Sequence, residues 1–294
     1  MCVTPVKMRP LIPLALIAWT TSVVAVAESL PASGGFPYPV TVAREYPPNL
    51  LRNGGFEDLD ATSGLPVAWE FGNMASSTQV SAGSSQEAHT GGRAAWATST
   101  GDWPGYWVQS VTVVEGVRYY AAVQSKFHML EGTTGLRVYT GQYADDGSWT
   151  NRTSNTDVRS YAEEAQGEGL ADFIDPQYLN TIKRGQWNLQ DLEFTVPTGK
   201  GVSQYDVWAG LYGIGTALVD DVYLGPAAFV LTGSISGDGL TSLRLVNLEG
   251  KEYLRQSLPP GASSSSFKVG LPSRLKSYQL EVTDRQGHVW RRAL

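Results

Sequence analysis

Short segments of alternating apolar and polar residues cover most of the chain from about residue 36 onward. A period of two is the pattern of a half-buried β-strand, and Gly, Pro, Asn and Asp at the segment ends are typical of turns. The composition agrees, with 32 Gly, 16 Pro, 14 Tyr and 9 Trp against 4 Met. The sequence therefore predicts an all-β protein of the sandwich or jelly-roll kind. The clearest strand candidates are 106–114, 118–127, 136–143, 188–196, 205–212 and 217–224.

A second series of alternating segments begins after Gly225 and Pro226. It predicts a small immunoglobulin-like β-sandwich over residues 227–294, preceded by a first domain over 49–226 and by an N-terminal linker or strand over 28–48. Residues 153–184 interrupt the rhythm of strands, and we interpret them as a long inserted loop. The predicted strands of the second series are 229–235, 242–247, 266–271, 278–283 and 288–291.

The first 27 residues have the pattern of a secretory signal peptide. Lys7 and Arg9 precede an apolar run, and Ala25-Val26-Ala27 ends the segment with small residues. A membrane anchor is the alternative, but the apolar run is short for the roughly 20 residues that a spanning helix needs. We expect a secreted or cell-envelope protein without a membrane span after cleavage. Cys2 is the only cysteine, so the mature chain would have no disulfide.

The charge balance is acidic, with 22 Lys and Arg against 28 Asp and Glu and a net charge of −6. Removal of residues 1–27 takes away Lys7 and Arg9 and no acidic residue, which brings the net charge to −8. Nucleic-acid binding depends on Lys and Arg that neutralise phosphates. The composition therefore argues against a nucleic-acid partner.

Several motifs occur in the order found in one family. Asn49-Leu-Leu-Arg-Asn-Gly-Gly-Phe-Glu57 and Pro66-Val-Ala-Trp69 lie near the start of the first domain, and Gly213-Ile-Gly-Thr-Ala-Leu-Val-Asp-Asp-Val-Tyr-Leu224 lies at its end. This series resembles the jelly-roll carbohydrate-binding modules of families four, nine and twenty-two, which have a galactose-binding-like fold. The resemblance implies a polysaccharide or other glycan as partner. The insertion at 153–184 and Trp96 depart from the family pattern.

The resemblance also implies a structural calcium ion between the first and last strands. Its acidic ligands here would be Glu57, Asp220 and Asp221. Calcium takes six to eight oxygen ligands, so carboxylates together with backbone carbonyls and water would suffice. The alternative is that these acids are solvated residues at strand ends.

Sugars are bound by aromatic rings that stack on their faces and by polar side chains that hold their hydroxyl groups. Strand alternation places such residues on the face opposite the core in three predicted strands, and Trp103 and Trp149 are candidates for the lips of a cleft. The alternative is that the rings cover core edges. If the strands are neighbours, one concave sheet would carry Gln124, Lys126, Arg137, Tyr139, Tyr143, Trp208 and Tyr212.

Signs of catalysis are few. The chain contains three histidines and neither an HExxH nor a GxSxG motif, and its acids lie mostly in turns. We therefore predict a secreted, non-catalytic carbohydrate-binding protein. A cell-envelope structural or adhesion protein, with self-association or an envelope protein as partner, is the alternative. A polysaccharide lyase is third, because Gln124, His128, Arg137 and Tyr139 have residue types that could neutralise a uronate and move a proton.

Overall fold

The computed structural model describes residues 25–30, 35–73, 79–101, 104–140, 158–159, 185–196, 198–199 and 201–294. For residues 25–27, 73, 104, 129–140, 158–159 and 212–213 it gives the course of the backbone only. Every secondary-structure element assigned in these ranges is a β-strand, which confirms the all-β prediction. No apolar helix of membrane-spanning length occurs within them.

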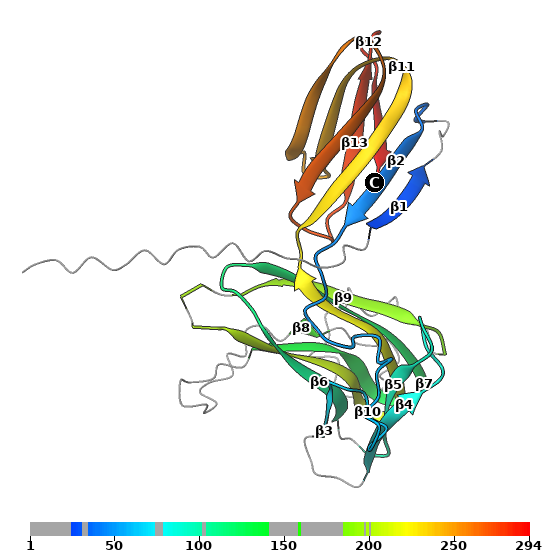
Figure 1. Cartoon of the computed structure of the whole chain (residues 1–294), viewed down its shortest axis with the longest axis vertical. Helices are drawn as coiled ribbons and strands as arrows, with labels where there is room; N and C mark the ends of the chain where they lie inside the picture. Colours follow the sequence, from blue (N-terminus) through cyan, green and yellow to red (C-terminus); the bar gives the residue numbers. More distant parts are fainter. Residues whose placement is uncertain are drawn as a thin grey trace, which may run out of the picture.

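The first domain, residues 49–226, is an eight-stranded sheet that curls into two layers (Figure 1). One layer contains β3, β6 and β8 with one half each of β7 and β10, and the other contains β4, β5 and β9 with the remaining halves. This arrangement confirms the predicted jelly-roll sandwich. The strands are β3 (Glu70–Asn73), β4 (Val80–Ser85), β5 (Ala94–Ser99), β6 (Pro104–Thr112), β7 (Arg118–Thr140), β8 (Val158–Arg159), β9 (Asn188–Thr195) and β10 (Gln204–Pro226).

The second domain is a small sandwich that also contains the first two strands of the chain. Strand β2 pairs with β11 from Val230 to Ile235, and its Val40 and Val42 are buried in the core of this domain. Strands β1 and β2 are therefore part of the second domain, and the first domain is inserted between β2 and β11. The immunoglobulin-like topology stays a prediction. The strands are β1 (Ala25–Leu30), β2 (Val40–Glu45), β11 (Phe229–Asn247), β12 (Glu252–Leu271), β13 (Tyr278–Asp284) and β14 (Val289–Ala293).

Several pairs of predicted strands are single long strands in the structure. The predicted strands 205–212 and 217–224 are both parts of β10, and 229–235 and 242–247 are both parts of β11. Glycines that we interpreted as strand ends instead lie where a strand bends from one layer to the other. Gly239 has a φ of +73°, next to register shifts between β11 and β12. A bulge of this kind bends a strand without ending it.

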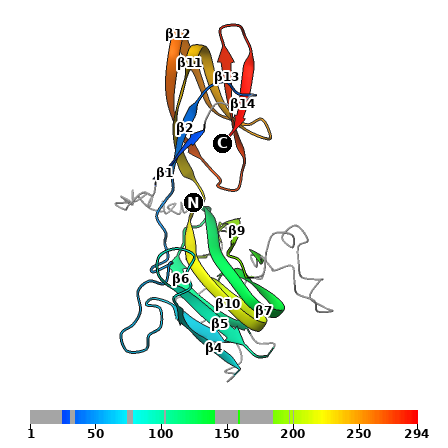
Figure 2. The ribbon, with the colours of Figure 1, turned by 90° about the vertical axis from the view of Figure 1, so that its right-hand side faces the viewer.

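The same correction applies to β7, which joins the predicted strands 118–127 and 136–143 as far as Thr140. It pairs with β10 over nearly its whole length, with register shifts at two places. Figure 2 shows the two strands side by side and curved along their length. Each domain thus has one long two-stranded ribbon, β7 with β10 in the first and β11 with β12 in the second.

The motif that opens the first domain is bonded to the last strand. The Asn49 side chain donates a hydrogen bond to the Val222 carbonyl and accepts one from the Leu224 amide. The Val222 amide in turn donates to the carbonyl of Gly54, where a side chain would collide with the Val222 carbonyl oxygen. These bonds close the sandwich between its two ends. They explain why the motif has Asn and Gly at these positions.

The core of the first domain lies between its two layers and is rich in aromatic rings. Phe56 and Trp107 are fully buried, and the Phe56 ring centroid lies 5.0 Å from that of Trp69. The Trp107 indole donates to the Trp96 carbonyl, so its single polar atom is satisfied inside the core. Burial of large rings is the main favourable term in folding a domain of this kind.

Candidate functional site

The alternation predicted for the central strands is present in the structure. On β10, Val207, Ala209 and Leu211 are buried, whereas Trp208 between them is half-buried on the opposite face. The same holds on β7, where Tyr119, Ala121, Val123, Ser125 and Phe127 are buried in the core. On the non-core face, Trp208 of β10 and Gln124 and Lys126 of β7 are half-buried and therefore partly accessible to a ligand.

The rings of Tyr106 and Trp208 form a stacked pair on this non-core face. Their centroids are 3.8 Å apart and their planes are inclined by 19°. Tyr106 lies on β6, opposite Gly72 of β3 on one side and Gly210 of β10 on the other. A side chain at Gly72 would collide with the Tyr106 ring, so glycine leaves the space that the ring occupies. Tyr106 is the first residue of the predicted strand 106–114, and in the structure this strand begins two residues earlier, at Pro104.

Polar groups lie beside the stacked rings. Asp206 is directly opposite Ser110 in the β6–β10 register, and the Ser110 hydroxyl donates to its carboxylate. Burial raises the pKa of Asp206, the Ser110 hydrogen bond opposes this effect, and the nearby Glu70 carboxylate adds to it. Buried and exposed hydrogen-bonding atoms thus adjoin an aromatic platform, which is the combination that sugar binding requires. We call the surface formed by Glu70, Tyr106, Ser110, Asp206 and Trp208 the aromatic face.

Two of the predicted ligand-binding residues lie far from the aromatic face along β7. Lys126 forms an ion pair with Glu87, and Gln124 lies opposite Asp220. Backbone pairing places Arg137 opposite Trp208, eleven positions from Lys126 on the same strand. At about 3.3 Å per residue this is roughly 35 Å of extended chain. The non-core face is therefore long, and Gln124 and Lys126 do not adjoin the stacked rings.

Other predicted residues are placed only in part. Backbone pairing puts Tyr139 opposite Asp206, and Tyr212 opposite Thr133 and Pro104. The side chains of Arg137, Tyr139 and Tyr212 lie outside what the structure describes, as do all atoms of Trp103, Tyr143 and Trp149. Their contribution to binding stays a prediction.

The residues considered for a lyase are not gathered at one point of the described chain. His128 Nε2 lies 3.3 Å from Glu87 Oε2. Nine positions of continuous strand separate His128 from Arg137, which is roughly 30 Å of extended chain. A general base must lie within hydrogen-bond reach of the proton it removes. His128 and Arg137 therefore do not form one catalytic group, as the lyase alternative would require.

The three acids predicted to bind calcium do lie in one region. A Cβ atom added at Gly55 would be 3.9 Å from Asp220 Oδ1, Asp221 Oδ1 and Glu57 Cγ. All three acids contact the loop that precedes β5. The Glu57 carboxylate accepts hydrogen bonds from the amides of Gly92 and Arg93.

The two aspartates hold the preceding residues of the same loop. Asp220 is fully buried and accepts hydrogen bonds from the amides of His89 and Thr90. Asp221 accepts from the Thr90 hydroxyl at 2.6 Å, and its other oxygen lies 2.6 Å from His89 Nδ1. Burial, the largest cause, raises the pKa of Asp220 to about 6. Sequence reasoning missed His89 and Thr90, because their role appears only when the loop meets the last strand.

These acids provide oxygen donors of the kind that calcium prefers. Within the described residues, no group of three or more His, Cys, Asp or Glu side chains is arranged to hold a metal ion. Instead, amide and hydroxyl groups of residues 89–93 donate hydrogen bonds to these carboxylate oxygens and use part of their capacity to accept hydrogen bonds. Calcium binding at this place stays a prediction.

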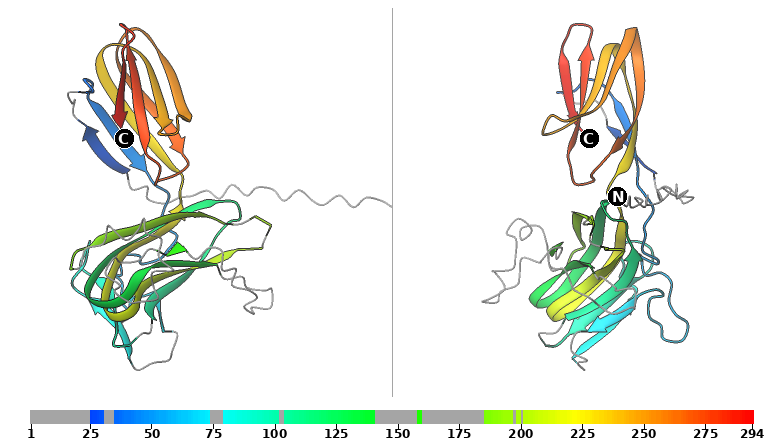
Figure 3. Two further views of the ribbon diagram at one scale, coloured as in Figure 1. Left: turned by 180° about the vertical axis from the view of Figure 1, so that it is seen from behind. Right: turned by 90° about the vertical axis from the view of Figure 1, so that its left-hand side faces the viewer.

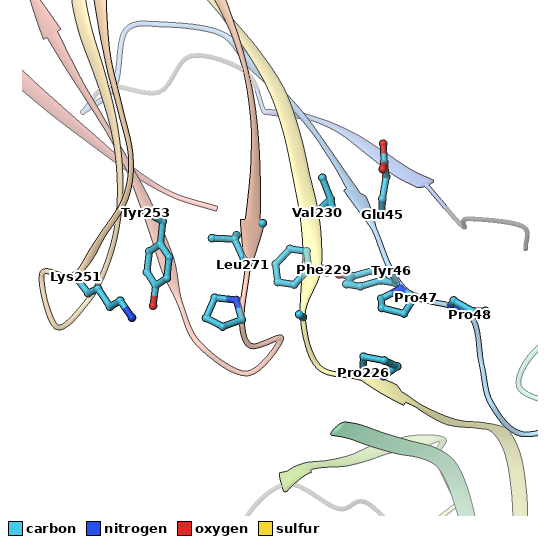
Figure 4. Close-up of a pocket in the computed structure, with 13 residues that line it drawn as sticks. Glu45, Tyr46, Pro47, Pro48, Pro226, Phe229, Val230, Lys251, Tyr253 and Leu271 are labelled. Carbon is cyan, nitrogen blue, oxygen red and sulfur yellow. The ribbon is translucent and has the colours of Figure 1, made fainter. Parts of the chain in front are cut away.

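A separate pocket of about 780 Å³ lies where the two domains meet (Figure 4). Its walls are mostly apolar, with the rings of Tyr46, Phe229 and Tyr253 and several prolines, and its charged side chains are Glu45 and Lys251. Sugar hydroxyls need closely spaced polar partners, which this lining offers only sparsely. The aromatic face is therefore the better candidate for a glycan.

Comparison with known proteins gives structural neighbours only. No family model and no curated protein sequence matches the chain. Three similar solved structures are TmCBM61 in complex with β-1,4-galactotriose, a family 22 xylan-binding domain of Paenibacillus barcinonensis, and the enzymatically active domain of tailspike protein 4 of bacteriophage CBA120.

The sequence identity to these three is 17%, 12% and 12%, and the TM-scores are 0.37, 0.36 and 0.40, in the same order. The matches cover 61%, 59% and 60% of this chain. They cover 99% and 91% of the two binding modules, but the chain spans only 21% of the tailspike. These similarities concern the course of the backbone.

Proposed function

We propose that this chain is a secreted, non-catalytic carbohydrate-binding protein that holds a polysaccharide against the aromatic face of its first domain. The observation that carries the proposal is the stacked pair of Tyr106 and Trp208 on a non-core face, next to hydrogen-bonding groups of Ser110 and Asp206. Rings of this kind offer an apolar platform to the C–H face of a sugar, and the neighbouring oxygens can fix its hydroxyl groups.

The length of the face favours a chain rather than a single sugar. The ribbon of β7 and β10 continues from Trp208 toward Lys126, and its non-core face carries further half-buried polar side chains such as Gln124. The two ends of this face belong to different layers, so a polymer that contacts both would follow the bend of the ribbon from one layer to the other. Multiple weak contacts along one ligand add up to a useful affinity.

The proposal includes a structural calcium ion near the end of β10. Glu57, Asp220 and Asp221 would be its protein ligands, and the ion would neutralise three acids that lie close together. It would take no part in sugar chemistry. Its role would be to hold the loop of residues 89–93 against the last strand in a chain without disulfides.

The test is a glycan array and a pull-down on insoluble polysaccharides with residues 28–294. We expect binding without turnover, and we expect Trp208→Ala to weaken it about 30-fold or more, which corresponds to about 2 kcal/mol. Trp290→Ala is the matched control, because Trp290 is a half-buried tryptophan of the second domain. Its affinity should equal that of the wild type.

Other outcomes would replace the proposal. A folded protein that binds none of the glycans and instead self-associates would favour a cell-envelope structural or adhesion protein. Unsaturated uronates that absorb in the ultraviolet would favour a lyase. Equal loss of binding in Trp208→Ala and Trp290→Ala would show that the aromatic face is not the site.

A further inference from the structure

The loop between β12 and β13 of the second domain is bonded to the first domain. Glu193 of β9 has a side chain that is only 1% exposed, and it forms an ion pair with Arg118 at 2.8 Å. Its carboxylate accepts hydrogen bonds from the Ser273 hydroxyl at 2.7 Å and from the Arg274 amide at 2.6 Å. A third bond comes from the Leu275 amide at 3.2 Å. A buried carboxylate of one domain is thus satisfied largely by the other.

Arg274 enters a set of three tyrosine rings. Its guanidinium carbon lies 4.3, 4.4 and 4.9 Å from the ring centroids of Tyr46, Tyr223 and Tyr120, respectively. The guanidinium also donates to the Tyr223 hydroxyl and to the Pro226 carbonyl. Tyr120 and Tyr223 belong to the first domain, so Arg274 crosses the boundary. A planar guanidinium suits both stacking and directed hydrogen bonds.

The two chain segments that cross between the domains are bonded to the first domain as well. The Tyr223 hydroxyl donates to the Pro47 carbonyl at 2.7 Å, and the Ala227 amide donates to the Arg118 carbonyl at 2.8 Å. Figure 3 shows from two further sides that the domains meet end to end at this place. The pocket of about 780 Å³ opens beside the crossing and is lined by Pro47, Pro48 and Pro226. The open space would allow bending if nothing else fixed the domains.

We infer that the two domains move as one rigid body, held by contacts that we call the domain joint: Arg118, Glu193, Tyr223, Ser273 and Arg274. The second domain, which contains both β1 and β14, acts as a mount that fixes the direction of the first domain. Two domains linked by short segments with a small, polar contact are expected to move relative to each other. Here a buried, fully bonded carboxylate and a stacked arginine make such motion costly.

The experiment measures the distance between spin labels on the two domains of the full chain. The labels are attached at Ser81→Cys on β4 and Ser263→Cys on β12, both exposed, in a Cys2→Ser background. We expect a narrow distance distribution in the parent and one about twofold broader or more in Arg274→Ala and in Glu193→Gln. Arg255→Ala is the matched control, because Arg255 is an exposed arginine of the second domain outside the domain joint.

Either of two results would overturn the inference. One is a parent distribution as broad as that of Arg274→Ala, and the other is an unchanged narrow distribution in both joint variants. Broadening in Arg255→Ala would remove the assignment to the domain joint. Arg274→Lys keeps the charge and loses the planar stacking group, so it should broaden the distribution by an intermediate amount.

A second measurement covers variants that fold poorly. Calorimetry of the parent should show a single unfolding transition, because each domain stabilises the other, and Glu193→Gln should split it into two. Two separate transitions in the parent would contradict a rigid joint. Neither the spin-label distances nor the calorimetry depends on glycan binding. The inference can therefore fail while the proposed function stands, and the proposed function can fail while the inference stands.

Discussion

The two domains are built alike and expose different chemistry. Each is a two-layer sandwich in which one long ribbon, β7 with β10 or β11 with β12, takes part in both layers. In the first domain, the residues opposite Tyr106 on both neighbouring strands are glycines, and the Tyr106 ring stacks on Trp208. The result is an aromatic platform bordered by a few oxygens.

The exposed face of the second domain carries a row of charges instead. Arg255, Arg244, Glu281 and Arg291 lie opposite one another on β12, β11, β13 and β14. Glu281 forms ion pairs with Arg244 at 3.0 Å and with Arg291 at 2.8 Å, and Arg255 pairs with Glu252 of its own strand at 2.8 Å. A row of this kind has little left to offer a neutral glycan. The comparison teaches that the residues on one face, and not the sandwich, decide what a domain can bind.

The largest effect is expected from truncation of a large core side chain in either domain. Trp107→Ala should lower the free energy of unfolding by about 3–5 kcal/mol, since it leaves a cavity and removes the hydrogen bond from the indole to the Trp96 carbonyl. Leu243→Ala in the second core should cost about 2–5 kcal/mol. Chemical denaturation measures both. Only Trp107→Ala should also weaken glycan binding. Trp107 lies between Tyr106 and Val108 on β6, so its loss should disturb the strand that holds the Tyr106 ring in place. Equal loss of binding in the two variants would break the comparison.

The pH dependence of stability tests the acids near the end of β10. Asp220 has a pKa of about 6 in the folded protein, above its ordinary value, because it is buried. The folded state then binds the proton more tightly than the unfolded state does. In EDTA, stability should therefore fall by up to about 3 kcal/mol as the pH rises from about 4 to 6 and change little above that.

Calcium would reverse this trend, because a bound cation holds the carboxylates in their ionised form. If Glu57, Asp220 and Asp221 bind calcium, the ion should raise the melting temperature, and the rise should grow with pH between about 4 and 6. The melting temperature is measured by thermal unfolding with calcium and with EDTA across this pH range. Asp220→Asn should abolish the dependence on calcium. Identical curves with and without calcium would contradict the calcium proposal.

Two glycines allow a matched test of the ribbons. A Cβ atom at Gly210 would lie 2.6 Å from Tyr106 Cα, so Gly210→Ala should cost about 1–3 kcal/mol and weaken glycan binding. Gly270 on β12 has no other atom within 4 Å of such a Cβ, so Gly270→Ala should be neutral or slightly stabilising. Denaturation and a binding titration compare the two. A harmless Gly210→Ala would show that Tyr106 does not need its present place.

The smallest effect is expected on the charged row of the second domain. Glu281→Gln removes two ion pairs of a carboxylate that is 10% exposed, and it should lower stability by about 1 kcal/mol. The loss should shrink at high salt, because screening weakens the charge pairs in the parent. Glycan affinity should not change. A change in affinity would show that the second domain takes part in binding.

Much of the secondary structure could be predicted from the pattern of residues. The alternation on β10 assigned Val207 to the core and Trp208 to the opposite face, and both assignments are confirmed. The boundary near Pro226 was visible as a restart of the strand pattern. The lengths of β7, β10, β11 and β12 were wrong, because a glycine at a bend and a glycine at a turn look the same in a sequence.

The site was predictable residue by residue but not as an assembly. Trp208 has the expected place, and the pairing with Tyr106 depends on the glycines of two other strands. Gln124 and Lys126 were grouped with Trp208 because strand alternation places all three opposite the core, and the continuous course of β7 separates them. Nothing in the sequence pattern indicated that Glu193 and Arg274, 81 positions apart, would meet.

By itself the sequence determined the strand type, the face on which each side chain lies and the acidic, glycine-rich character of the chain, because these depend on residues close together. Only the tertiary structure decided which strands are neighbours, that β1 and β2 complete the second domain, and that Arg274 bridges the two domains. Strand pairing joins residues far apart in sequence through backbone hydrogen bonds that are nearly the same for every residue type. The pairing is therefore selected by the packing of the whole core.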